Sequence, residues 1–173
     1  MYKKILCLMF LGAFLGGCVA TKLPSNLQSP QNFQIEKFTG TWYEIGKMKS
    51  MFESELKNTT YEYFVDKNGT INLMKNAKSQ NSEKDFNEIY ELKRVDLNNT
   101  ASMKIKSFAG DKLHNIVKID DDYNYAMIFG ADTSELYLLS RTKTMPEMIK
   151  AIFTSYAAKF GYNTDKIIWT TQE

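Results

Sequence analysis

Cysteine, histidine and arginine are scarce in this chain of 173 residues, which has 2 cysteines and 1 histidine. Only Arg94 and Arg141 are arginine among the 22 basic residues. The sequence lacks a Gly-rich phosphate loop and a metal-ligand cluster, so no cofactor and no metal are expected. No spacing indicates a Ser-His-carboxylate group, and His114 is expected to be a polar surface residue on a strand, so no catalytic residue is predicted.

Long apolar runs are also missing, since the longest lies at the start of the chain and is too short to span a bilayer. Lys3 and Lys4 precede apolar residues 5–15, and Leu15-Gly16-Gly17-Cys18 follows, which is the order of a secretory signal. We therefore expect residues 1–17 to be removed, and Cys7 with them. The Leu-Gly-Gly-Cys pattern resembles the bacterial lipobox, which implies that lipid is attached to Cys18. In the alternative, an ordinary signal peptide without lipidation, Cys18 is incidental.

Charge is balanced once this leader is removed. Two of the 22 basic residues leave with it, so 20 basic residues face 20 acidic ones. A neutral chain offers no basic face for nucleic acid. Residues 18–33, rich in Pro, Ser, Asn and Gln, are expected to form a lipidated start and a flexible tether with a reach of about 20 Å. Residues 34–173 then form one domain.

Short segments in which apolar and polar residues alternate occupy residues 40–141. Turn residues such as Asp66-Lys67-Asn68-Gly69 separate them. Eight strands are predicted, at 40–49, 58–66, 70–77, 86–95, 101–108, 113–119, 123–130 and 135–141. Consecutive strands with short links predict an antiparallel meander, and closure into a barrel removes its exposed edges.

One amphipathic helix is predicted after the strands. Thr144 and Glu147 have capping-box spacing, with Pro146 early in the first turn, and Gly161 can end the helix. Its predicted apolar face consists of Met148, Ile149, Ile152, Phe153, Tyr156, Ala157 and Phe160. We expect this face to pack on the barrel wall; the alternative, a membrane surface, is less favoured because the polar face has few cations. A short strand over 166–170 follows.

Two motifs resemble those of a known family. Gly40-Thr41-Trp42-Tyr43-Glu44-Ile45 is similar to the G-x-W motif of lipocalins, and Leu138-Leu139-Ser140-Arg141-Thr142 is similar to their closing arginine motif. With the Leu-Gly-Gly-Cys lipobox, the helix and the final Ile-Ile-Trp, the chain from Phe33 onward resembles the bacterial outer-membrane lipocalins. Their middle motif is one residue short here, in the Asp120–Ala126 stretch, whose acidic run is interpreted as a solvated turn rather than a cation site.

The resemblance implies an eight-stranded antiparallel up-and-down β-barrel with a C-terminal helix on its wall and a short final strand. It also implies diacylglycerol on Cys18 and a membrane anchor in the cell envelope. The anchor lies in the outer membrane if the host is Gram-negative, because Val19 and not Asp follows Cys18. The implied partner is a fatty acid, a lysophospholipid or a similar amphiphile, bound for transport, storage or scavenging.

Three motif residues have a structural interpretation. Trp42 is a large flat plug for one barrel end, and Arg141 can lie on its ring and donate to nearby carbonyl groups, which Lys would do poorly. Gly40 lets the backbone pass close to the turn beneath it. These residues are structural motif positions rather than ligand contacts.

Strand alternation with Trp42 facing inward predicts the lining of the barrel. The predicted ligand-binding residues are Glu44, Tyr61, Tyr63, Leu73, Met103, Ile105, Val117, Ala126, Ile128, Tyr137 and Leu139. Gly46, Val65 and Ile119 also fall on the inward-facing phase of their strands. Lys75 falls on the inward phase as well, and it could bind the carboxylate or phosphate group of a ligand near the mouth of the barrel. A mostly apolar lining suits an acyl chain, because burial stabilises by roughly 0.8 kcal/mol per methylene. Alternatively, these side chains fill a small closed core.

Three functions therefore stay open at this point. The favoured function is lipid binding by an envelope-anchored barrel. The second is a non-catalytic interaction or maintenance lipoprotein that uses the barrel as a scaffold, and the third, an enzyme acting on an acyl substrate, has little support. Met51 and Phe52, between the first two strands, could form an apolar lid or an ordinary loop core.

Overall fold

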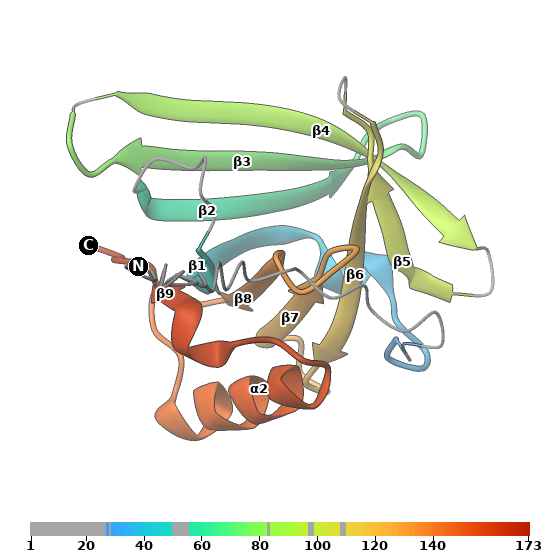
Figure 1. Ribbon diagram of the computed structural model, residues 1–173. Helices are drawn as coiled ribbons and strands as arrows, with labels where there is room; N and C mark the ends of the chain where they lie inside the picture. Colours follow the sequence, from blue (N-terminus) through green and yellow to red (C-terminus); the bar gives the residue numbers. More distant parts are fainter. Residues whose placement is uncertain (1–26, 28, 50–55, 83, 97–98, 108–109) are drawn as a thin grey trace, which may run out of the picture.

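A computed structural model describes residues 27, 29–49, 56–82, 84–96, 99–107 and 110–173. The short helix α1 (Ile35–Phe38) precedes the strands β1 (Gly40–Met48), β2 (Leu56–Val65), β3 (Ile71–Ser79), β4 (Asp85–Asp96), β5 (Asn99–Ile105), β6 (Lys112–Ile119), β7 (Tyr125–Phe129) and β8 (Leu136–Ser140). Helix α2 (Glu147–Lys159), the 3₁₀ turn η1 (Thr164–Lys166) and β9 (Ile167–Trp169) follow (Figure 1). Within the described residues, no helix has the length and apolarity needed to cross a membrane.

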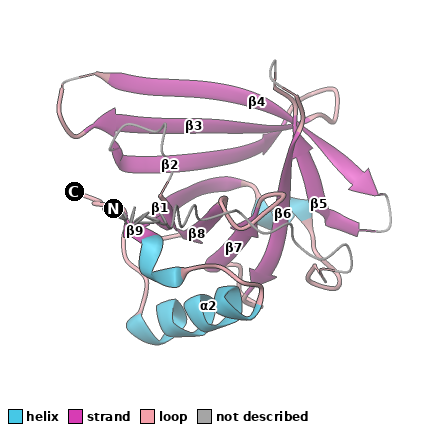
Figure 2. Ribbon diagram, viewed as in Figure 1, coloured by secondary structure: helices cyan, strands magenta, loops and turns pink. Residues whose placement is uncertain are grey.

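The strands form one antiparallel sheet that closes on itself. The sheet order is β2-β3-β4-β5-β6-β7-β8-β1-β9, and an additional pairing of β1 with β2 closes the barrel. Helix α2 lies outside this barrel, next to the wall that contains β7 and β8 (Figure 2). The predicted barrel, its outer helix and the short final strand are therefore confirmed.

The turn before β7 delays the start of that strand relative to the predicted 123–130. The Asp120 carboxylate accepts hydrogen bonds from the backbone N–H groups of Asn124 and Tyr125, at 2.8 and 2.6 Å. Tyr123 has a φ of 58°, in the left-handed region that strands do not use. The acidic residues 120–122 thus lie in the turn that the sequence predicts, but the turn extends to residue 124 and pairing starts at Tyr125.

Arg141 and Trp42 meet at one end of the barrel, which we call the closed end. The Arg141 guanidinium carbon lies 3.9 Å from the centre of the Trp42 ring, and the Trp42 side chain is fully buried. The guanidinium donates hydrogen bonds of 2.8 to 3.2 Å to four backbone carbonyl groups, those of Lys37, Thr39, Thr41 and Tyr123. The stacking on Trp42 and the bonds to the N-terminal segment are as the sequence predicts, and the bond to Tyr123 also joins this segment to the β6–β7 turn.

Gly40 is needed beside this guanidinium. Its φ is +91°, which L-residues rarely adopt, and a Cβ atom there would lie 3.4 Å from Nη1 of Arg141. The position thus has both of the features that favour glycine, a left-handed backbone and a close neighbour.

Helix α2 uses only part of its predicted apolar face to cover the barrel. Phe153 and Ala157 are buried against the wall, and Ile149, Tyr156 and Phe160 pack around them. Met148 and Ile152 instead face solvent, with 72% and 48% of their surface exposed, so their predicted burial is wrong. They lie at the side of the packed face, beyond the strip that a helix can bury on a sheet.

The ends of α2 differ in how well the sequence predicted them. The predicted capping box is wrong, because Pro146 is the N-cap residue and no side chain caps the helix there. The carbonyl group of Thr144 accepts hydrogen bonds from the hydroxyls of Ser140 and Thr142, which keeps this segment outside the helix. At the other end Gly161 has a φ of +85° and its N–H donates to Ala158, so a Schellman-type turn ends the helix as predicted.

The closed end yields a stability prediction. Arg141→Lys should lower the free energy of unfolding by about 2–4 kcal/mol, because lysine cannot reach four carbonyl groups in one plane while covering the indole ring. Urea unfolding measures this change. Arg94→Lys, at the exposed second arginine, is the matched control and should alter stability by less than about 0.5 kcal/mol. Equal losses in the two variants would contradict the structural role of Arg141.

Candidate functional site

The barrel interior is lined mainly by one cluster of apolar side chains. Seven predicted site residues are buried in this cluster: Tyr61, Tyr63, Leu73, Met103, Ala126, Ile128 and Leu139. Ile105 and Tyr137 are partly buried and pack against it. The structure thus brings nine predicted residues together on the inner face of the barrel. Ligand contact by these residues stays a prediction.

A β-bulge in β6 corrects the predicted role of Val117. The pairing shifts between Ile116, opposite Ile128, and Lys118, opposite Met127. An extra residue in one strand reverses the alternation of side chains beyond it. Val117 therefore belongs to the cluster beneath α2, and it is not a lumen residue. Ile116, which the sequence prediction missed, is fully buried in the interior cluster.

The same bulge explains why His114 was assigned to the wrong face. His114 is 3% exposed, and Nε2 of its ring lies 2.8 Å from the Tyr63 hydroxyl. The expectation of a surface histidine is therefore wrong. The sequence prediction takes the phase of this strand from Val117, which lies within the irregular stretch, and therefore places the residues before it on the opposite face. Burial lowers the pKa of His114 to about 4, while burial and Tyr137 raise the pKa of Tyr63.

A second bulge, in β1, changes the lining next to Glu44. The register shifts between Glu44 and Gly46, and a Cβ atom on Gly46 would lie 3.1 Å from the Trp169 ring. Gly46 thus faces β9 on the outside of the barrel rather than the lumen. Lys47 is buried, with Nζ 4.0 Å from the Glu44 carboxylate. Val65, at the end of its strand, is exposed and does not line the interior.

Glu44 is the centre of a polar area in the inner wall. Its carboxylate is fully buried and accepts hydrogen bonds of 2.7 Å from the hydroxyls of Tyr61 and Thr170. The ring of Tyr61 lies 5.8 Å from that of Tyr137, and Nζ of Lys75 lies 6.0 Å from the Tyr61 ring. This places Lys75 on the inward phase, as predicted. The interior therefore combines an apolar surface with a carboxylate, phenols and ammonium groups on one side.

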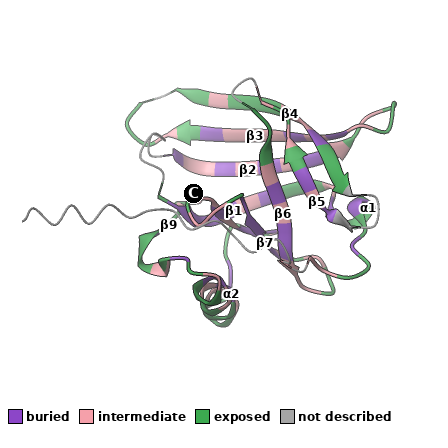
Figure 3. Cartoon of the chain, turned by 45° about the vertical axis from the view of Figure 1, so that its right-hand side comes forward, coloured by how far each residue is buried: buried purple, intermediate pink, exposed green. Residues whose placement is uncertain are grey.

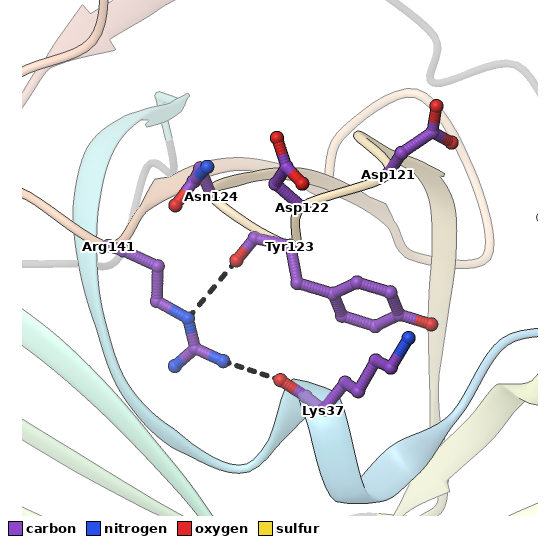
Figure 4. A pocket seen from close by; sticks show the side chains of 6 residues that line it. All are labelled: Lys37, Asp121, Asp122, Tyr123, Asn124 and Arg141. Carbon is purple, nitrogen blue, oxygen red and sulfur yellow. Dashed lines mark hydrogen bonds between the residues drawn. The ribbon is translucent and has the colours of Figure 1, made fainter.

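Two pockets formed by described residues lie outside this lining. One, of about 400 Å³, is at the closed end and is lined by Lys37, Asp121, Asp122, Tyr123, Asn124 and Arg141 (Figure 4). The carboxylates of Asp121 and Asp122 point away from Arg141 in this view. The other pocket, of about 460 Å³, lies between the β3–β4 turn and residue Glu173. In the described part of the chain, no three His, Cys, Asp or Glu side chains lie together as a metal site would require.

Three residues with a predicted role in the mature protein's function lie outside the described residues. These are Cys18, the predicted lipidation site, and Met51 and Phe52, the candidate lid.

The buried histidine gives a pH prediction. Between pH 6.5 and about 4 the unfolded chain protonates its histidine while the folded chain does not, so lowering the pH favours unfolding. The resulting loss is about 2 kcal/mol on going from pH 7 to pH 5, measured by urea unfolding. His114→Gln removes the only histidine and should flatten this slope. An unchanged slope in the variant would assign the pH dependence to other groups.

Comparisons with known proteins agree with this architecture. The Outer membrane lipoprotein Blc of Citrobacter freundii is 30% identical over 159 residues, which covers 90% of this chain and 88% of the relative. The protein of the same name from Vibrio cholerae is 28% identical and covers 98% of this chain and 99% of the relative. The solved structure of the cockroach allergen Per a 4 has a TM-score of 0.67 at 15% identity, over 88% of this chain and 96% of that one, which is a likeness of fold.

The family comparison extends over the whole barrel. Residues 33–172 match the Lipocalin-like domain family. This range includes both the Trp42 and Arg141 motifs and the residues that line the interior. The chain therefore belongs to the lipocalin-like family.

Proposed function

We propose that this lipocalin is anchored to the cell envelope through an acylated Cys18 and binds an acyl-chain amphiphile, such as a fatty acid or a lysophospholipid, in its barrel. The observation that carries the proposal is the inner lining, an apolar surface with a polar area around Glu44 on one side. Such a surface matches a molecule that has a long apolar chain and a polar head. The role that follows is transport, storage or scavenging of membrane lipids.

The closed end supports a single direction of insertion. Phe38 lies 4.8 Å from the Trp42 ring and 4.7 Å from the Tyr63 ring, so aromatic side chains fill the base of the barrel. An acyl chain would enter from the opposite end with its methyl group first. Each buried methylene contributes roughly 0.8 kcal/mol, so a long chain can exceed the free-energy cost of association.

The envelope location is supported by the relatives, which are named outer membrane lipoproteins and are matched over 88% and 99% of their lengths. The Leu-Gly-Gly-Cys sequence at residues 15–18 supplies a lipidation site. Several acyl chains on one cysteine hold a protein on a membrane where a single chain would not. Binding rather than catalysis is proposed, because the one histidine is buried inside the barrel against Tyr63.

A scaffold function is the second candidate, and one observation favours it. The buried interior residues form one continuous cluster from α1 to β8, which is also what a filled core would look like. In that case the barrel would present its outer surface to a protein partner and carry no lipid. The two functions differ in whether lipid accompanies the folded protein.

Lipid loading should therefore distinguish the candidates. We expect mass spectrometry of purified Cys18→Ser protein to find about one acyl lipid per barrel, and Ala126→Trp to abolish loading by filling the interior, where Ala126 is fully buried. Ala151→Trp, on the exposed side of α2, is the matched control and should keep its lipid. A lipid-free Cys18→Ser protein would favour the scaffold function, and loading that survives in Ala126→Trp would contradict the proposed binding site.

Anchoring gives a separate prediction. Cys18→Ser should move the protein from the membrane fraction to the soluble fraction and abolish incorporation of labelled palmitate. Cys7→Ser, in the predicted leader, should change neither measurement. Palmitate incorporation that persists in Cys18→Ser would contradict lipidation at this cysteine.

A further inference from the structure

Strands β1 and β2 close the barrel over only part of their length. They pair from Gly40 opposite Tyr63 to Tyr43 opposite Thr60. Beyond this point β9 takes the same edge of β1, with Gly46 opposite Trp169. The register of β2 against β3 also shifts between Lys57 and Thr60, next to a left-handed Asn58 with a φ of 52°. The two strands therefore separate, and the residues that follow β9 lie between them.

Residues 170–173, which we call the seam segment, connect the two strands. The N–H of Thr170 donates to the carbonyl group of Ile45 at 3.0 Å, and the N–H of Asn58 donates to that of Thr171 at 2.8 Å. The Gln172 amide bridges the gap, donating to the carbonyl groups of Glu44 at 2.8 Å and Thr59 at 2.9 Å. On the outside, Nζ of Lys57 lies 2.9 Å from the Glu173 carboxylate.

The seam segment also reaches the polar area of the lumen. The Thr170 hydroxyl donates to one oxygen of the Glu44 carboxylate, while Tyr61 donates to the other. Without the seam segment, a fully buried carboxylate would lose one of these two donors, and the backbone carbonyl groups of Glu44 and Thr59 would lose theirs. A buried polar group without a partner is costly, so these contacts hold Glu44 in place.

Not every hydrogen-bonding group of the barrel wall has a partner beside the seam segment. Among the described residues, the hydroxyl of Thr59 is the one buried side-chain oxygen or nitrogen atom that lacks a hydrogen-bond partner. Two hydrogen bonds between backbone groups attach the seam segment, and its other bonds involve side chains, whereas β2 and β3 share an uninterrupted ladder from Thr60 to Val65. Fewer backbone bonds make this section easier to open than the ladders.

We infer that the seam segment is a separable section of the barrel wall that holds Glu44 in position and controls how fast an acyl ligand leaves. Thr170 and Gln172 are the positioning residues of this section. The inference rests on the proposed function, since it concerns the ligand of the same barrel. An opening between β1 and β2 gives an acyl chain a lateral exit that an intact wall denies.

Release of a fluorescent fatty acid from the Cys18→Ser protein, followed by stopped flow, tests this inference. Thr170→Val and Gln172→Ala should each raise the release rate about tenfold, the equivalent of one hydrogen bond. Thr170→Ser keeps the hydroxyl and should release the probe at the rate of the unsubstituted barrel. A change in protein stability alone would not predict this recovery. Thr154→Val removes a hydroxyl that bonds the backbone of α2 and is the matched control, with no change in release.

The outcomes separate the inference from the function. Unchanged release in folded Thr170→Val and Gln172→Ala, with normal binding of the probe, overturns the inference and leaves the proposed function standing. No binding of the probe to the unsubstituted barrel overturns both. Amide hydrogen exchange of the unsubstituted protein keeps the inference testable if a variant does not fold. The N–H groups of Thr170 and Asn58 should exchange faster than those paired between β7 and β8, and equal protection would overturn it.

Discussion

The planar guanidinium of Arg141 is the interaction on which the rest of the barrel depends. It stacks on the Trp42 ring and binds carbonyl groups on both sides of the barrel base, in the α1–β1 connection and in the β6–β7 turn. Arg141 is 100 residues from Thr41 in the chain, so one side chain offsets a large loss of chain freedom. It also seals one end, and any ligand route must therefore lead to the other end or through the wall.

Two apolar clusters, one on each side of the sheet, explain the different strand patterns. Strands β6 to β8 and β1 are covered by the lumen cluster on one face and by α2 on the other, whereas the outer face is only partly buried in β2 and β3 and mostly exposed in β4 (Figure 3). Strand β7 is accordingly buried at four consecutive residues, 126–129, while β2 alternates between buried and less buried positions. A strand buried on both faces has a continuous apolar sequence, and a strand buried on one face alternates.

The difference between strands buried on one face and strands buried on both faces decides how much of the barrel the sequence could predict. Alternation and turn residues located all eight strands, and the Trp42 and Arg141 motifs fixed the closed end. Apart from Val65, which is exposed at the end of β2, the errors in the lining arise at bulges. Nothing in a single sequence marks Val117 as the extra residue in β6, because Ile116 and Val117 are equally apolar and either phase gives a plausible strand. His114 was misplaced for the same reason, although its own environment is unambiguous once the register is known.

The bulge in β1 connects the chemistry of the lumen to the closure of the wall. Because the alternation changes after Glu44, Lys47 comes to lie beside the carboxylate and Gly46 turns outward. Gly46 leaves room for the Trp169 ring, which would meet a Cβ atom at 3.1 Å. This close approach allows β9 to take the edge of β1, and β9 in turn directs Thr170 toward Glu44. Strand β2 leaves β1 at the same level, where Asn58 has a left-handed backbone and the register with β3 shifts. The polar area of the lumen and the break between β1 and β2 are therefore connected through Thr170, which follows β9 and donates to Glu44.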